Sequence, residues 1–244
     1  MQGLLSPLHL NLWLSSMSLG LSLTLNSTIA CVYSSPSINQ NQRRKYMIFK
    51  KKKTEDDNAV RDINPQTLNN ESGWQSLSPA LIHQAQQLPA QKESWSCGPN
   101  SAYRALCLNG QHTSAKGLQS FIENCPVSLG GHDSTKIGPT PSKLAKYIDN
   151  YTSSSVNECS CVKWNSFWPA IQGNLGKHPS LVLVQFSTFK LHYVNVVGYN
   201  SHSKEVAILD TNNSLEAWTI EQFRHLTAIS AKYLSKNYYA IHLT

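Results

Sequence analysis

Charge is scarce in this sequence and unevenly placed. Only 14% of the 244 residues are charged, and positions 1–42 contain no Lys, Arg, Asp or Glu. Seven of the 21 basic residues fall in "RRKYMIFKKKK", positions 43–53, so the rest of the chain has 14 basic against 14 acidic residues. A body without net charge gives no reason to expect a basic face for nucleic acid. We therefore predict no nucleic-acid partner and interpret the basic run as a linker or membrane-surface element.

Cofactor motifs are also missing. The sequence contains neither a Gly-rich phosphate-binding loop nor a His/Glu ligand cluster, so we expect no organic cofactor and no metal. Cys159-Ser160-Cys161 has no second pair at zinc-finger spacing, which argues against a structural zinc site. An even number of cysteines is compatible with disulfides in a secreted protein, although a chain of this length does not need them to fold. The six cysteines are Cys31, Cys97, Cys107, Cys125, Cys159 and Cys161.

The first 75 positions differ in composition from the rest. Residues 1–42 are uncharged, apolar and Ser-rich, and three interpretations stay open: a signal sequence, a membrane anchor, or translation that really starts at Met47. The protein would be secreted or membrane-associated in the first two cases and cytoplasmic in the third. Any membrane association would use residues 8–53. Residues 43–75 are expected to form a basic and then polar linker, and residues 76–244 one folded domain.

Within that domain, helical patterns precede strand patterns. Segments 79–88, 99–108, 115–122 and 167–175 are predicted to be helical, as is "PSKLAKYIDNY", which begins with a proline after Thr140. The later runs "SLVLVQF", "HYVNVVGYN", "EVAILD" and "YYAIHL" are β-branched and aromatic, which predicts consecutive strands. Helices followed by strands indicate an α+β fold.

Four residues could form a site for nucleophilic catalysis. Cys97, in "QKESWSCGPNS", falls at or just before a predicted helix N-terminus, where a thiol is readily ionised. A cysteine nucleophile needs a base, a group that orients the base, and donors for the oxyanion. His192 opens a strand, and Asp210 closes the next one, so the two could pair. Gln91, six positions before the cysteine, could donate to the oxyanion together with the Cys97 N–H.

Other residues compete for these roles. His132 and His202 could replace His192 as base, but each lies in a loop or turn without a strand to hold its ring. Asn195 or Asn212 could replace Asp210 as the orienting group. Further candidates have a simpler expected role: Cys107 and Cys125 are expected to be core or surface thiols, and Trp95 either walls the cleft or belongs to the core.

The segments "QKESWSCGPNS", "LHYVNVVGYN" and "VAILDTNN" together resemble the papain-like cysteine peptidase superfamily, in particular the group of double-glycine leader peptidase domains of bacteriocin exporters. The resemblance covers about residues 88–243. It implies Cys97 as nucleophile, His192 as general base and acid, Asp210 as orienting group and Gln91 as oxyanion donor. It also implies a papain-like fold, in which a helical part carries the cysteine and a twisted antiparallel sheet carries the histidine and aspartate. One departure is Asp210-Thr211, where leader peptidases usually have Asp-Pro.

The sequence therefore favours a cysteine-dependent hydrolase, a peptidase that cleaves amide bonds of a peptide or protein substrate through a thioester intermediate. Two alternatives stay open. A deamidase or acyltransferase could use the same triad, because the acceptor depends on cleft shape, and a non-catalytic binding protein could keep the same fold.

Overall fold

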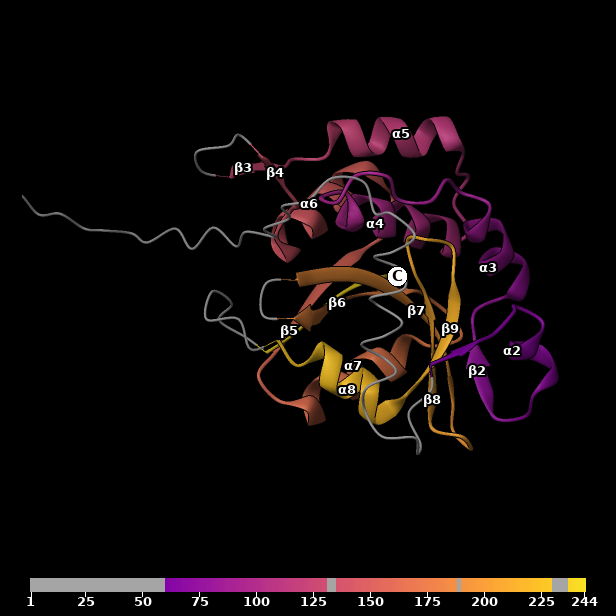
Figure 1. Ribbon diagram of the computed structural model, residues 1–244. Helices are drawn as coiled ribbons and strands as arrows, with labels where there is room; N and C mark the ends of the chain where they lie inside the picture. The colour runs from indigo at the N-terminus through magenta and orange to yellow at the C-terminus, as the bar shows by residue number, and fades with distance from the viewer. Residues whose placement is uncertain (1–59, 131–134, 188–189, 230–236) are drawn as a thin grey trace, which may run out of the picture.

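The computed structural model describes residues 60–130, 135–187, 190–229 and 237–244, which form an α+β fold (Figure 1). The helices are α2 (Thr67–Asn70), α3 (Pro79–Gln86), α4 (Cys97–Leu108), α5 (Ala115–Asn124), α6 (Pro141–Tyr151), α7 (Trp164–Asn174) and α8 (Ile220–Thr227). The strands are β1 (Arg61–Asp62), β2 (Trp74–Ser76), β3 (Ser128–Gly130), β4 (Thr135–Ile137), β5 (Val156–Cys161), β6 (Ser180–Ser187), β7 (Lys190–Asn200), β8 (Glu205–Leu209), β9 (Leu215–Thr219) and β10 (Tyr238–Leu243).

One antiparallel sheet forms the centre of the molecule. Its strand order is β1-β9-β8-β7-β6-β10-β5, and β2 adds a further pairing to β7. Register shifts interrupt the β6–β7 pair between Gln185 and Ser187, and the β7–β8 pair between Val196 and Gly198. Such bulges increase the local twist of a sheet. Strands β3 and β4 form a separate two-stranded sheet.

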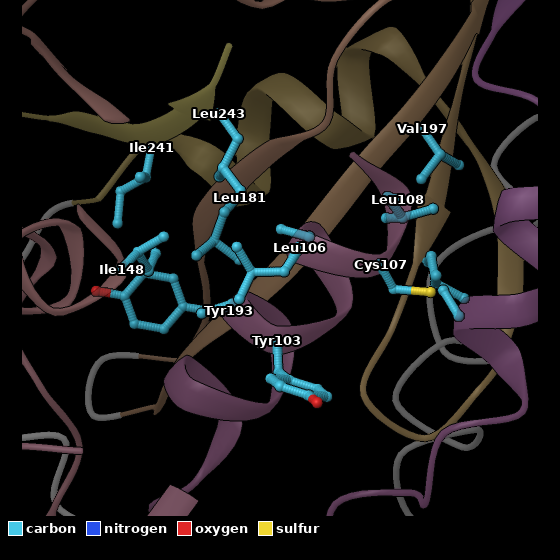
Figure 2. Close-up of a cluster of buried hydrophobic side chains, with 14 of the residues drawn as sticks. Tyr103, Leu106, Cys107, Leu108, Ile148, Leu181, Tyr193, Val197, Ile241 and Leu243 are labelled. Atoms are coloured by element: carbon cyan, nitrogen blue, oxygen red, sulfur yellow. The ribbon is translucent and has the colours of Figure 1, made fainter. Parts of the chain in front are cut away.

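Helix α4 packs on one face of this sheet, on the same side as α5 and α6 (Figure 1). All its residues are buried. Gly98 lets the first turn approach its neighbours, because a Cβ there would lie 3.3 Å from Leu144, Pro139 and Tyr193. Pro99 is tolerated in this turn, where the N–H groups have no intrahelical acceptor. Figure 2 shows the core that results, in which the labelled side chains are Tyr103, Leu106, Cys107, Leu108, Ile148, Leu181, Tyr193, Val197, Ile241 and Leu243.

Helices α7 and α8 cover the opposite face of the sheet (Figure 1). Aromatic side chains fill the space between these helices and the sheet. Trp164 and Trp168 stack with their ring centroids 5.5 Å apart, and Trp164 meets Phe223 edge-on at 6.1 Å. Phe167 stacks on Tyr238 at 5.1 Å. Aromatic rings bury large apolar areas. This second core therefore holds α7 and α8 against the sheet by apolar contacts between rings.

The predicted fold class is confirmed. The expected helices appear as α3 to α7 and the four expected strands as β6, β7, β8 and β10, in the expected arrangement of a helical part and a twisted antiparallel sheet. The sequence patterns did not predict the remaining elements, which are α2, α8, β1 to β5 and β9. Strand β5, "VNECSC", lacks the apolar alternation that predicts a strand, and β9, "LEAWT", contains no Val or Ile.

The folded body also begins earlier than the predicted boundary at residue 76. Arg61 in β1 pairs with Ala217 in β9, and Trp74 in β2 pairs with Asn200 in β7. The described part of the expected linker therefore belongs to the sheet. Residues 1–59, with the expected signal or anchor segment and the basic run, lie outside the described residues, as does Cys31. Among the described residues, no helix is long and apolar enough to cross a bilayer.

Candidate active site

Cys97 is the first residue of α4 and is almost fully buried, with 1% of its surface exposed. The unpaired N–H groups and the dipole of a helix N-terminus stabilise negative charge. The Cys97 sulfur therefore lies where a charge that develops on it would meet these N–H groups. The predicted position of the cysteine, at or just before a helix start, agrees with the structure.

His192 and Asp210 lie side by side on neighbouring strands. His192 is near the start of β7, and Asp210 directly follows β8. These strands pair antiparallel, with Asn195 opposite Leu209, so the start of one lies beside the end of the other. His192 Nε2 and Asp210 Oδ1 are 2.6 Å apart, a short charge-assisted hydrogen bond.

The thiol of Cys97 also acts on the imidazole of His192, whose Nε2 is bound to Asp210. Burial by itself would lower the pKa of His192, but the charge of Asp210 and the hydrogen bonds to Asp210 and Cys97 raise that pKa above its ordinary value. The ring is thus stabilised as imidazolium between a carboxylate and a sulfur atom.

Asp210 is stabilised as a carboxylate in turn. Burial would raise its pKa, but the His192 charge and hydrogen bonds from His192 and Thr211 lower that pKa below its ordinary value. Side-chain exposure is 12% for His192 and 20% for Asp210, so this pair is more accessible than the sulfur atom. The cysteine, histidine and aspartate chosen from the sequence therefore meet at one place, although α4 and the two strands are far apart in the chain.

Gln91 lies next to this cluster and is bound from two sides. Its Oε1 accepts a hydrogen bond from Thr211 Oγ1 at 2.8 Å. Its Nε2 donates to the backbone oxygens of Glu93 at 2.7 Å and Ser94 at 3.4 Å, in the loop that leads to Cys97. The role of Gln91 as an oxyanion donor stays a prediction, because its Nε2 donates to backbone oxygens of this loop.

The alternative residues have other surroundings. The side-chain amide of Asn195 donates to the Ser101 oxygen of α4 at 3.1 Å, and the Asn212 side chain accepts from the Ser214 N–H at 2.8 Å. The His202 N–H donates to Asn200 Oδ1 at 2.9 Å, at the turn between β7 and β8. His132 lies outside the described residues.

The other described cysteines lack such activating contacts. Burial raises the pKa of Cys107 and brings the pKa of Cys125 to about 12, which keeps both as neutral thiols. Cys159 and Cys161 lie on β5 with their sulfur atoms 3.4 Å apart. All five described cysteines are free thiols, and the described residues contain no group of three or more side chains suited to hold a metal ion.

Arg104 is a functional residue of this region that sequence reasoning did not single out. Its guanidinium is fully buried beside the site and donates to backbone oxygens of the loop before Gln91 and of Thr211. Burial lowers the pKa of Arg104, and the charge of Asp210 partly offsets this. A signal was present, because Arg104 is the single charge inside the apolar helical run "SAYRALCL".

Comparisons with known proteins define the class of protein. The model of the Peptidase_C39 like family matches residues 79–241, and the chain therefore belongs to this family of peptidase-like proteins. This interval contains all four candidate residues. No curated protein matches the chain.

Two solved structures are similar at low sequence identity. One is described as a C39-like peptidase from Bacillus anthracis, with 12% identity and a TM-score of 0.46, and the match covers 65% of this chain and 92% of that one. The other is a double glycine motif protease from an AMS/PCAT transporter in complex with the leader peptide, with 18% identity and a TM-score of 0.42. That match covers 64% of this chain and 89% of the protease.

Proposed function

We propose that the chain is a cysteine peptidase that hydrolyses amide bonds of a peptide or protein with a triad of Cys97, His192 and Asp210. The observation that carries this proposal is the imidazole of His192, which is bound by Asp210 at 2.6 Å and whose pKa is raised by Asp210 and by the Cys97 thiol at the helix start. A cysteine that only fills space in the core would need neither a histidine beside it nor an aspartate beside that histidine. Membership in a peptidase-like family supports the same reaction class.

The reaction begins when His192 takes the proton of the Cys97 thiol. The sulfur attacks the amide carbon, a C–S bond forms, and the carbonyl oxygen becomes an oxyanion. Collapse of this intermediate breaks the C–N bond, and the imidazolium gives its proton to the leaving amine. A water molecule, deprotonated by His192, then attacks the thioester, which releases a carboxylic acid and restores the thiol.

The oxyanion needs hydrogen-bond donors. The Cys97 N–H belongs to the first turn of α4, where N–H groups have no intrahelical acceptor and can face the oxygen. Gln91 supplies the second donor in this proposal, after its Nε2 exchanges the Glu93 oxygen for the oxyanion. The substrate approaches from the side of His192 and Asp210, because their side chains are partly exposed and the sulfur is covered.

The test is cleavage of a peptide library by the full chain and by Cys97→Ala. We expect cleavage by the wild type, and a loss of about a thousandfold or more in Cys97→Ala, because among the described thiols the triad base acts on Cys97 alone. Cys107→Ala is the matched control, since Cys107 is equally buried on the same helix and should be dispensable. Equal cleavage by Cys97→Ala and the wild type would refute the proposal, and ammonia release without cleavage would indicate a deamidase.

A further inference from the structure

Thr211, which directly follows Asp210, has all its polar groups engaged with the proposed site. It is 3% exposed. Its N–H donates to Asp210 Oδ1 at 2.5 Å, and its Oγ1 lies 2.8 Å from Gln91 Oε1 and 3.1 Å from Asp210 Oδ1. Its backbone oxygen accepts from the Gln91 N–H at 2.9 Å and from Arg104 Nη2 at 3.3 Å. One residue therefore contacts both the carboxylate of the triad and the glutamine.

The contacts on the carboxylate converge on one atom. Asp210 Oδ1 meets His192 Nε2 as well as the N–H and hydroxyl of Thr211. Donors on an ionised carboxylate stabilise its charge and fix its orientation. Because the Thr211 hydroxyl has a single proton between Gln91 and Asp210, it also couples the positions of these two side chains.

The buried guanidinium of Arg104 connects the segments that carry Gln91 and Asp210. Arg104 donates to the backbone oxygens of Leu88 at 3.3 Å and Pro89 at 2.8 Å, and also to that of Ala85. The same guanidinium reaches the Thr211 oxygen. The segment before Gln91 and the segment after Asp210 are thereby tied to the helix that carries Cys97, so a shift of Thr211 would be felt at all three.

We propose that Thr211 is a positioning residue, which aims the Asp210 carboxylate at His192 and holds the Gln91 amide beside the loop that leads to Cys97. This inference rests on the proposed function. Thr211 touches no reacting atom, so it acts through Asp210 and Gln91. Among the described residues, the charged and titratable groups that act on this carboxylate and imidazole are the two groups themselves, Cys97 and Arg104.

The test uses the rate of Cys97 alkylation by iodoacetamide as a function of pH, which needs no substrate. Thr211→Val keeps the shape and the N–H but removes the hydroxyl. A less stabilised carboxylate holds the imidazolium less well, and the thiolate that pairs with the imidazolium is then less favoured. We therefore expect the alkylation window, the pH range in which Cys97 reacts, to begin at a higher pH, and the rate near neutral pH to fall about tenfold. Thr211→Ser restores the hydroxyl and should restore the window. Thr211→Ala also removes the hydroxyl, and it replaces Thr211→Val in the test if the valine variant does not fold.

The matched control is Thr227→Val. Thr227 is fully buried, and its hydroxyl donates to the Phe223 oxygen of α8 at 2.8 Å, on the opposite face of the sheet. It should lower the melting temperature like Thr211→Val but leave the alkylation window unchanged. A wild-type window in folded Thr211→Val or Thr211→Ala would overturn the positioning role while the proposed function stands. An unactivated Cys97 in the wild type would overturn both.

Discussion

The two faces of the central sheet pack against different kinds of side chain. The face under α4 contains buried polar groups, among them Asn100, Ser101, Arg104 and Asn195, all at most 1% exposed. The face under α7 and α8 contains stacked and edge-on aromatic rings. Polar contacts are directional and fix distances, whereas apolar contacts mainly supply burial. The difference suggests that the α4 face adds to its apolar core a set of polar contacts that hold the site in place, whereas the face under α7 and α8 contributes to stability alone.

The contrast is sharp around the helix that carries Cys97. Arg104 Nε donates to Asn100 Oδ1 at 2.9 Å, Ser101 Oγ donates to the Tyr193 oxygen at 2.7 Å, and Asn195 donates to the Ser101 oxygen. The last two bonds join α4 to β7, the strand that carries His192. On the opposite face, the buried side-chain pair of Ser180 and His242 is a polar exception, at 2.9 Å.

The largest loss of stability is expected on the aromatic face. Phe167 is fully buried and packs between Trp164 and Tyr238. Phe167→Ala leaves a cavity, so the free energy of unfolding should fall by about 3–5 kcal/mol in urea titrations. If the two faces have separate tasks, the folded variant should keep the wild-type rate of Cys97 alkylation. A slower rate in the folded variant would contradict this division.

Arg104→Met makes the opposite kind of change on the α4 face. It keeps an apolar stem but leaves the Pro89 oxygen without its donor and takes one of two donors from the Leu88 and Thr211 oxygens, so the free energy of unfolding should fall by about 3 kcal/mol. Unlike Phe167→Ala, it should also slow Cys97 alkylation, because the segments around Gln91 and Asp210 lose their common anchor. Arg104→Lys, which keeps the charge and some donors, should lie in between. Unchanged alkylation in Arg104→Met would assign this arginine to stability alone.

We expect His242, on the face of the sheet under α7 and α8, to make the free energy of unfolding depend on pH. Burial lowers the pKa of His242 to about 4, so its neutral form is favoured in the folded chain. The unfolded chain then binds the extra proton between about pH 6.5 and 4, and this contribution to stability is lost as the pH falls through that range. At about 1.4 kcal/mol per pH unit, the loss is at most about 3 kcal/mol.

The check is urea unfolding of the wild type and His242→Gln at several pH values between 4 and 7. The glutamine variant should lose less stability on acidification than the wild type, because it has no proton to gain. Parallel curves for the two proteins would contradict the assignment. Cys97 alkylation at pH 7 should be the same in both, since His242 lies on β10 and contacts Ser180 of β6.

The sequence predicted the closeness of the three candidate residues better than the scaffold around them. Cys97, His192 and Asp210 could be found because a helix start and two strand ends are visible in local patterns and their chemistry is specific. Strand β9 and the pairing of β1 could not be found, because short strands depend on partners distant in the chain. The contacts of Thr211 and Arg104 with Gln91 and Asp210 likewise arise only when the loops meet.

The most direct test of the central claim is the pH dependence of iodoacetamide alkylation at Cys97, in the wild type and in His192→Ala. Cys107 serves as internal standard, because it is equally buried on the same helix and its pKa is raised. We expect Cys97 to react roughly thirtyfold or more faster than Cys107 near neutral pH, because an ordinary thiol is only a few per cent ionised there. His192→Ala should abolish this advantage. Equal rates for Cys97 and Cys107 in the wild type, or an advantage that survives without His192, would contradict the central claim.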